Sequence, residues 1–243
     1  MSVPVRVAMW SGPRNISTAM MRSWENRPDT VVVDEPLYAA YLARTGIDHP
    51  GRDAVLASQP TDLAQAVAAL SAPLAPGVAV HYAKHMTHHV DEGMDVGWSL
   101  AFRNVALIRD PSEVVSSYVR SREACEPRDI GVLQQHWLVG TWEAAGRPAP
   151  IIDAGDFLRA PEAYLRWLCD WLKVPFTDRM LAWPPGPRDS DGVWAPHWYD
   201  AVWRSTGFAP WRPREIALSE HDAAVAEACR PAYAAMYARR LRL

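Results

Sequence analysis

Five short apolar runs, most of them followed by a stretch of helical pattern, constrain the fold of this chain more than any other feature. The runs lie at 3–10, 30–33, 77–82, 104–108 and 150–152. Short runs rich in β-branched residues are typical of buried strands. Helical patterns lie at 19–24, 37–41, 61–70, 113–119, 162–172 and 220–242. Because strands that alternate with helices form a parallel sheet covered on both faces, the sequence predicts a three-layer α/β/α fold with a central parallel sheet.

Two stretches fall outside this alternation. Residues 46–60 are rich in Gly and Pro and are expected to be a link. Residues 183–213 are expected to be an irregular aromatic loop, because they combine many prolines with five tryptophans, namely Trp183, Trp194, Trp198, Trp203 and Trp211. No internal repeat interrupts the pattern, so we expect residues 1–243 to form a single domain that ends in a C-terminal helix.

Composition excludes several classes of function. A net charge of −3 gives no electrostatic reason to expect a nucleic acid or an anionic membrane as partner. No apolar run reaches 18 residues and no basic leader begins the chain, which predicts a soluble, unsecreted protein. Cys125, Cys169 and Cys229 form neither a disulfide framework nor a metal motif, which fits a cytoplasmic location. The sequence leaves open whether the chain forms homo-oligomers.

The turn at residues 11–18 joins the first predicted strand to the first predicted helix. Such a turn directs several backbone N–H groups and the positive end of the helix dipole at one point, which is typical of a phosphate site. Ser17 or Thr18 is placed to cap the helix. Arg14 adds a cation to these two hydroxyls, a combination that suits a polyanion better than a single carboxylate.

This turn differs from an ATP- or GTP-binding loop. That loop has Gly-Lys directly before its Ser or Thr, so that the Lys reaches the outer phosphates. Ile16 stands in the place of the Lys, and Arg14 is the nearest cation. A phosphoryl-transfer enzyme is therefore a weaker interpretation of the turn.

Polar clusters follow four of the five predicted strands. They are the turn itself, Glu35 after the second strand, Lys84 with nearby histidines after the third, and Arg109 after the fourth. Pro36 favours an extended backbone at Glu35. Because ligands of open α/β sheets bind beyond the C-terminal ends of the strands, we expect these clusters to converge on one site.

The turn at 11–18 resembles the loop with which sulfotransferases bind the 5′-phosphosulfate of PAPS (3′-phosphoadenosine 5′-phosphosulfate). Residues 109–117 resemble the family's second motif, in which a strand-terminal Arg and a Ser eight residues later hold the 3′-phosphate. The resemblance covers residues 5–160, and stretches 191–199 and 204–208 are similar to an uncharacterised bacterial sulfotransferase-like group. It implies a P-loop NTPase-like fold, PAPS as donor, PAP as product and no metal.

The resemblance also implies donor-binding residues. Arg109 and Ser117 correspond to the ligands of the 3′-phosphate. The residues that correspond to the 5′-phosphosulfate loop are Gly12, Pro13, Arg14, Asn15, Ile16, Ser17 and Thr18.

Two departures from the family pattern carry expectations of their own. Asn15 and Ile16 replace the usual Ser-Gly, and since Ile adopts a positive φ only at a cost, we expect the loop to bend differently. Ala19 stands where some members have a Trp that stacks on adenine, so another side chain is expected to do so.

Sulfuryl transfer needs a base for the acceptor proton, cations for the leaving phosphate, and in-line positioning. Arg14, with the N–H groups of the loop, is our candidate for the cation at the bridging and 5′-phosphate oxygens. The resemblance implies Lys84 as a second cation in the active site. Glu35 matches the base of several carbohydrate-type sulfotransferases, and it is the favoured base. His88 and His89 are the alternatives, because Met86 stands where the cytosolic type has its His.

Histidines and tryptophans near these motifs have two interpretations each. The spacing of His85 and His89 suits two metal ligands on a helix face, with His81 and His88 close by, but no carboxylate or cysteine pattern accompanies them. We therefore predict no metal site. The loop at 183–213 either walls an acceptor pocket or is a packed surface excursion.

The sequence as a whole predicts a PAPS-dependent sulfotransferase that acts on a hydroxyl or amine of a small-molecule acceptor. Two alternatives stay open. One is a nucleotide-dependent kinase, and the other is a protein of the same fold that binds a nucleotide without turnover.

Overall fold

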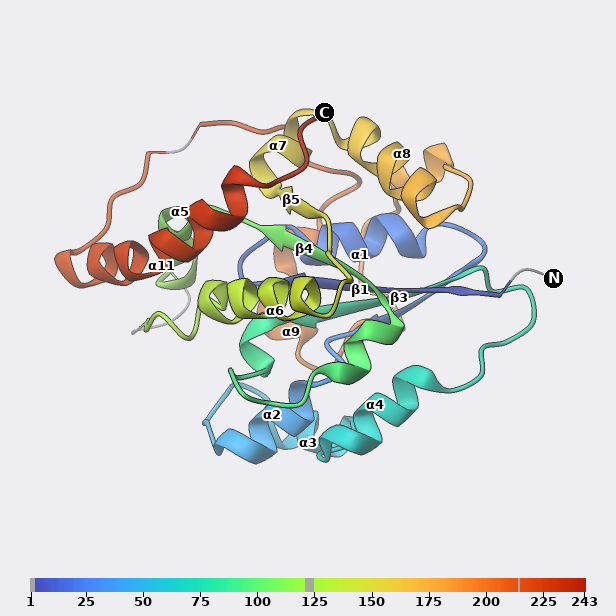
Figure 1. Cartoon of the computed structure of the whole chain (residues 1–243), viewed down its shortest axis with the longest axis horizontal. Coiled ribbons are helices and arrows are strands. Elements are labelled where there is room, and N and C mark those ends of the chain that lie inside the picture. The colour runs from blue at the N-terminus through green and yellow to red at the C-terminus, as the bar shows by residue number, and fades with distance from the viewer. Residues whose placement is uncertain (1–2, 121–124, 214) are drawn as a thin grey trace.

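A five-stranded, all-parallel sheet forms the centre of the molecule (Figure 1). The computed structural model describes residues 3–120, 125–213 and 215–243. The strands are β1 (Val5–Ser11), β2 (Thr30–Asp34), β3 (Val80–Met86), β4 (Arg103–Ile108) and β5 (Ile151–Asp153). Their order across the sheet is β2-β3-β1-β4-β5.

Helices cover both faces of this sheet, as Figure 1 shows. On one face lie α1 (Ser17–Glu25) and α8 (Pro161–Leu172), whose Trp24 and Leu168 pack in one buried cluster with Met9 of β1. On the other face lie α4 (Leu63–Ser71), α6 (Val132–Ala144) and α11 (Glu220–Ala238). There, Trp142 of α6 and Trp10 of β1 are fully buried. The predicted three-layer α/β/α fold with a central parallel sheet is therefore confirmed.

The remaining helices lie in the connections between these strands and helices. They are α2 (Tyr38–Thr45), α3 (Arg52–Ser58), α5 (Pro111–Tyr118), α7 (Ala154–Arg159), α9 (Ala195–Trp198) and α10 (Asp200–Trp203), together with the 3₁₀ helices η1 (Thr87–His89), η2 (Gly97–Ala101) and η3 (Asp178–Leu181). Within the described ranges, none of the helices combines the length and apolar character that crossing a bilayer requires.

Three sequence-based expectations about these elements were wrong. The link expected at 46–60 contains α3, whose Val55 is buried against α2. The third strand begins later than expected and continues to Met86, so Lys84 lies inside it. The segment 183–213 is not irregular throughout, because α9 and α10 lie within it.

The strand order places a crevice beside β1. From β1 the chain crosses past β3 to reach β2, and from β3 it crosses past β1 to reach β4. The connections that leave the C-terminal ends of the neighbouring strands β1 and β3 therefore run in opposite directions, which makes this place a topological switch point. In open α/β sheets this switch point is where ligands bind.

Candidate functional site

A cavity of about 340 Å³ lies at the C-terminal ends of the strands. The turn between β1 and α1 lines one part of it with residues 13–19, and Arg109, Ser117 and Tyr118 belong to the same lining. Other residues of the wall are Glu35, Tyr38, His49, Lys84, Met86, His88, Trp198, Tyr199, Ala201 and Val202. The four polar clusters that were expected to converge thus contribute to one cavity.

The turn bends at Arg14, which has a φ of +54°. Ile16 keeps a φ of −87°, so the strained position is two residues before it. Among the described residues, only Arg14, Glu35 and Lys173 combine a side chain with a positive φ. Such conformations cost energy and collect at functional sites. Two of the three line this cavity, which marks it as the candidate site.

The N-terminus of α1 is left open towards the cavity. The helix begins at Ser17, and no side chain of the described residues caps it, so the cap predicted from Ser17 or Thr18 was wrong. Instead, Asn15 Oδ1 accepts from the Ile16 N–H (2.8 Å), and its Nδ2 donates to the Leu107 carbonyl (2.9 Å). Asn15 thereby fastens the turn to β4. The first-turn N–H groups of α1 remain available to an anion.

Gly12 lies behind this turn, against the segment before α6. A Cβ atom on Gly12 would stand 2.3 Å from the carbonyl oxygen of Ile130. The glycine therefore permits a close approach of two backbone segments. This packing position distinguishes it from residues 13–18, which line the cavity.

Hydrogen bonds join the two motifs of the sequence, at 11–18 and at 109–117. Arg109 Nη1 donates to the main-chain oxygen of Arg14 (2.7 Å), and Arg14 Nε donates to Ser117 Oγ (3.1 Å). Glu113, in the first turn of α5, holds the Arg109 guanidinium through an ion pair of 2.8 Å. Burial lowers the pKa of Arg14, and the positive charges of Arg120 and Arg109 lower it further. Clustered arginines of this kind favour the binding of an anion.

Glu35 enters the cavity from the end of β2. Its φ is +40°, so the extended backbone expected before Pro36 was wrong. The Glu35 N–H donates to the Lys84 carbonyl (2.9 Å), and its Oε1 accepts from Lys84 Nζ (2.8 Å). Burial raises the pKa of Glu35 and so does the charge of Asp34, while the Lys84 ammonium opposes both. A carboxyl whose pKa is raised by burial is suited to accept and release a proton.

Lys84 lines the cavity, but its ammonium is fully engaged by protein groups. It donates to Asp34 Oδ1 and Glu35 Oε1, each at 2.8 Å, and to the Tyr199 hydroxyl. Burial opposes its charge, yet Asp34 and Glu35 outweigh burial and hold the pKa of Lys84 well above its ordinary value. An ammonium has three protons, so these three acceptors account for all of them.

The histidines separate into different environments. His88 lines the cavity, whereas His89 lies between the rings of Tyr38 and Tyr41, with centroids 4.8 and 4.9 Å away. His89 Nε2 is 3.8 Å from Glu35 Oε2, and burial lowers the pKa of His89 well below its ordinary value.

His85 stacks on Trp10 at 4.2 Å, and His81, on the same strand, is buried as well. Over the described part of the chain, no group of three or more His, Cys, Asp or Glu side chains is arranged to hold a metal ion.

The sequence interpretation missed several residues of this site. The clearest are Asp34 and Tyr199, which hydrogen-bond at 2.7 Å across 165 positions of sequence. Tyr199 falls within a stretch that the resemblance singled out, but no local pattern connects it with Lys84. Tyr38 and His49 also reach the cavity, and no pattern near them indicated that they do. Trp198 reaches it as well, as one of the two interpretations of the loop at 183–213 expected.

Comparison with known proteins places the chain in a family. A family model described as a sulfotransferase domain matches residues 5–240. A curated Arabidopsis thaliana protein, "Branched-chain-amino-acid aminotransferase-like protein 1", is 37% identical over 227 residues. That match covers 91% of this chain, and the chain spans only 40% of the length of the plant protein.

Solved structures share the fold. The "Sulfotransferase Domain from the Curacin Biosynthetic Pathway" aligns with a TM-score of 0.57 at 16% identity, covering 94% of this chain and 98% of that one. A sulfotransferase from Alicyclobacillus acidocaldarius aligns with a TM-score of 0.52 at 12% identity, covering 99% of this chain and 98% of that one. The P-loop-like sulfotransferase fold implied by the sequence is therefore confirmed. By this match over almost its whole length, the chain belongs to the sulfotransferase domain family.

Proposed function

We propose that this chain transfers a sulfuryl group from PAPS to a hydroxyl or amine of a small-molecule acceptor. One observation carries the proposal. A single cavity combines an anion-binding turn and clustered arginines with a buried carboxylate, Glu35. The first set of groups suits a phosphorylated donor, and the carboxylate suits the removal of a proton from an acceptor.

The donor end has groups for two separate phosphates. Arg14 and the open N-terminus of α1 would bind the 5′-phosphosulfate. Arg109 and Ser117 would bind the 3′-phosphate from the end of β4 and from α5. Tyr118, which follows Ser117 and lines the same cavity, is our candidate for the ring that contacts the adenine.

The transfer itself needs little covalent chemistry from the protein. PAPS, when bound, supplies the sulfuryl group. Glu35 accepts the proton of the acceptor hydroxyl or amine as that atom bonds to sulfur. The bond between sulfur and the bridging oxygen breaks, and its electron pair stays on the phosphate of PAP. Arg14 and the N–H groups of α1 stabilise the charge that develops there.

His88 is the alternative base, since it also lines the cavity. Glu35 is preferred because its carboxylate is held at a fixed place by Lys84 and is itself exposed to the cavity. His89 lies behind Glu35, outside the lining, so direct contact with an acceptor is not part of the proposal.

Calorimetry on the purified protein tests the donor site. Adenosine 3′,5′-bisphosphate is compared with AMP and with ATP, each with and without Mg²⁺. The proposal expects tight binding that requires the 3′-phosphate and is independent of Mg²⁺. A preference for Mg·ATP would instead indicate a kinase, and binding of the bisphosphate without any transfer from PAPS would indicate a nucleotide-binding protein.

A further inference from the structure

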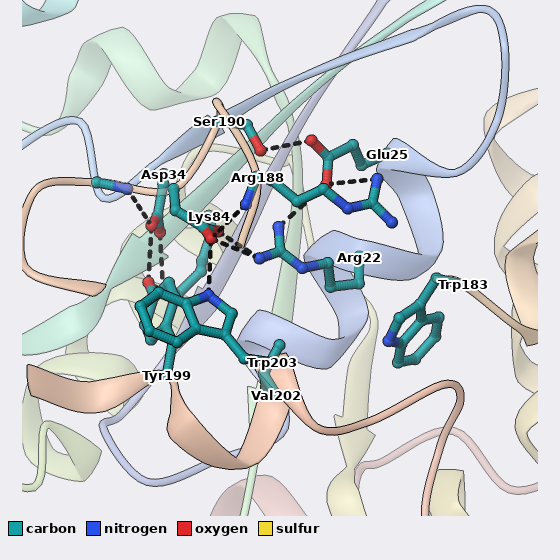
Figure 2. A network of polar contacts seen from close by, with 12 residues as sticks. Arg22, Glu25, Asp34, Lys84, Trp183, Arg188, Ser190, Tyr199, Val202 and Trp203 are labelled. Atoms are coloured by element: carbon teal, nitrogen blue, oxygen red, sulfur yellow. Dashed lines mark hydrogen bonds and ion pairs between the residues drawn. The ribbon is translucent and has the colours of Figure 1, made fainter. Parts of the chain in front are cut away.

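The stretch 191–203 is fastened to α1 and to the end of β2 by buried polar contacts. Figure 2 shows these contacts between α1, β2 and the segment that contains α9 and α10. Asp191 accepts from Arg22 Nη2 at 2.5 and 2.7 Å and from Trp203 Nε1 at 2.9 Å. Arg22 is only 1% exposed, so this ion pair is shielded from solvent. The contacts fix the segment on the helix that follows the phosphate-binding turn.

Tyr199 is the point at which this segment reaches the catalytic groups. Its hydroxyl donates to Asp34 Oδ2 (2.7 Å) and accepts from Lys84 Nζ. Trp194 Nε1 also donates to it (3.2 Å), and the Gly192 N–H donates to Asp34 Oδ2 (3.1 Å). In Figure 2, Tyr199, Asp34 and Lys84 meet at one place, with the ring of Tyr199 on the side of α9 and α10.

The ammonium of Lys84 has three protons and therefore three directions in which it can be held. Asp34 and Glu35 fix two of these, both from the end of β2. The hydroxyl of Tyr199 fixes the third from a different element. Without it, the ammonium keeps two acceptors on neighbouring residues and is free to rotate between them. Glu35 would then lose the fixed partner that directs its carboxylate.

We propose that Tyr199 is a positioning residue for sulfuryl transfer: its hydroxyl, held by Asp34, completes the coordination of the Lys84 ammonium and thereby fixes Glu35 towards the acceptor. The proposal rests on the proposed function, in which Glu35 is the base. The same segment contributes Trp198, Ala201 and Val202 to the cavity wall. Occupation of that wall by an acceptor is thus linked, through one short segment, to the orientation of the base.

The pKa of Glu35 reports directly on its connection with Tyr199 through Lys84. The groups that face it from the surrounding elements are Asp34, Tyr38, His49, Lys84, His88, His89 and Tyr199. Burial raises the pKa of Glu35 and the Lys84 ammonium lowers it; the charge of Asp34 raises it, and the hydroxyl of Tyr199 lowers it. Removing that hydroxyl should therefore raise the pKa of Glu35. Removing the charge of Asp34 should lower it.

The test compares Tyr199→Phe with a matched control, Tyr233→Phe. Tyr233 is also buried and also donates its hydroxyl to an aspartate, Asp153 (3.0 Å), but on α11 and away from the cavity. In Tyr199→Phe, transfer from PAPS to tyramine should show kcat reduced about 10- to 100-fold, the scale on which a small displacement of a catalytic group acts. Binding of adenosine 3′,5′-bisphosphate should be unchanged, and the acid limb of the kcat profile should move to higher pH. Tyr233→Phe should leave all three unchanged.

A second measurement needs no acceptor. The carboxyl signal of Glu35 in ¹³C-glutamate-labelled protein, assigned by its loss in Glu35→Gln, is titrated by NMR. Tyr199→Phe should move this titration to higher pH and Asp34→Asn to lower pH. If the wild-type chain transfers no sulfuryl group, the proposed function fails. The titration still shows whether the Tyr199 hydroxyl acts on the carboxyl of Glu35. A Glu35 titration that is the same in wild type and Tyr199→Phe would overturn the positioning role.

Discussion

Arg109 donates a hydrogen bond of 2.7 Å to the main-chain oxygen of Arg14, 95 positions earlier in the sequence. Since Arg14 is the residue at which the turn adopts its positive φ, this bond stabilises the strained conformation from outside the turn. Arg109 is in turn held by Glu113. The two motifs that would hold the two phosphates are therefore one connected unit.

This unit leads to a prediction for Arg109→Ala. Affinity for adenosine 3′,5′-bisphosphate should fall about 10- to 100-fold more than affinity for AMP, because a charge-assisted bond to phosphate contributes about 1.5–3 kcal/mol. The lost bond to Arg14 should weaken the binding of both nucleotides alike, so the difference between the two losses of affinity measures the contact with the 3′-phosphate. Arg166→Ala is the control, since Arg166 forms a similar i,i+4 pair with Glu162 on α8. Equal losses of affinity for the two nucleotides would show that Arg109 does not bind the 3′-phosphate.

Glu35→Gln should reduce kcat about 10²- to 10⁴-fold, the usual contribution of a general base, and leave nucleotide binding intact. In the wild-type protein, kcat should fall with decreasing pH as the carboxylate takes up a proton. Because burial raises the pKa of Glu35, that fall should begin at a higher pH than for an ordinary carboxylate. Steady-state kinetics over pH 5–9 checks both expectations. Unchanged turnover in Glu35→Gln would exclude Glu35 as the base and favour His88.

Most of the sheet could be predicted because strand patterns are local. The apolar runs at 30–33 and 104–108 match β2 and β4 to within one residue. The end of β3 could not be predicted, because Lys84 and His85 look like residues of a loop. They are buried in a strand since their partners, Asp34 and Trp10, come from other strands. The helix α6 was not predicted, for a related reason. Its Gln135 is a polar residue that is buried because its side chain donates to two main-chain carbonyls of the sheet.

The lining of the cavity could be predicted where its residues are contiguous in the sequence and not where the fold brings distant residues together. The two motifs of the proposed donor site occupy short stretches with a fixed spacing, so a sequence can display them. The contact between Tyr199 and Asp34 spans 165 positions and has no spacing rule. The positive φ of Glu35 was equally hidden, because Pro36 favours an extended backbone and the Glu35 N–H bonds to a carbonyl of another strand, that of Lys84.

Gly12→Ala should destabilise the protein, because the new Cβ would meet the Ile130 carbonyl at 2.3 Å. Two backbone segments must then separate, and overpacking of this kind costs about 1–3 kcal/mol. Gly140→Ala is the control: Gly140 lies in α6 with no atom within 4 Å of an added Cβ, so it should gain about 0.5–1 kcal/mol. Urea unfolding measures both. Equal stability of Gly12→Ala and wild type would show that the turn can move away from Ile130.

The buried histidines of β3 should make the protein lose stability in mild acid. Burial lowers the pKa of His85 to about 3 and that of His81 to about 4, from an ordinary value of 6.5. As the pH falls below 6.5, the unfolded chain therefore binds protons that the folded chain does not, and the free energy of unfolding decreases.

His85→Phe should retain the stacked ring on Trp10 and remove one of these protons. Between pH 6 and 4, its stability should fall less steeply than that of the wild-type protein, by up to about 1.4 kcal/mol per pH unit. His136→Gln, which changes an exposed histidine, is the control. Urea unfolding at a series of pH values gives the slopes. Identical slopes for His85→Phe and wild type would mean that His85 becomes protonated in the folded state, against its burial between Trp10 and Trp98.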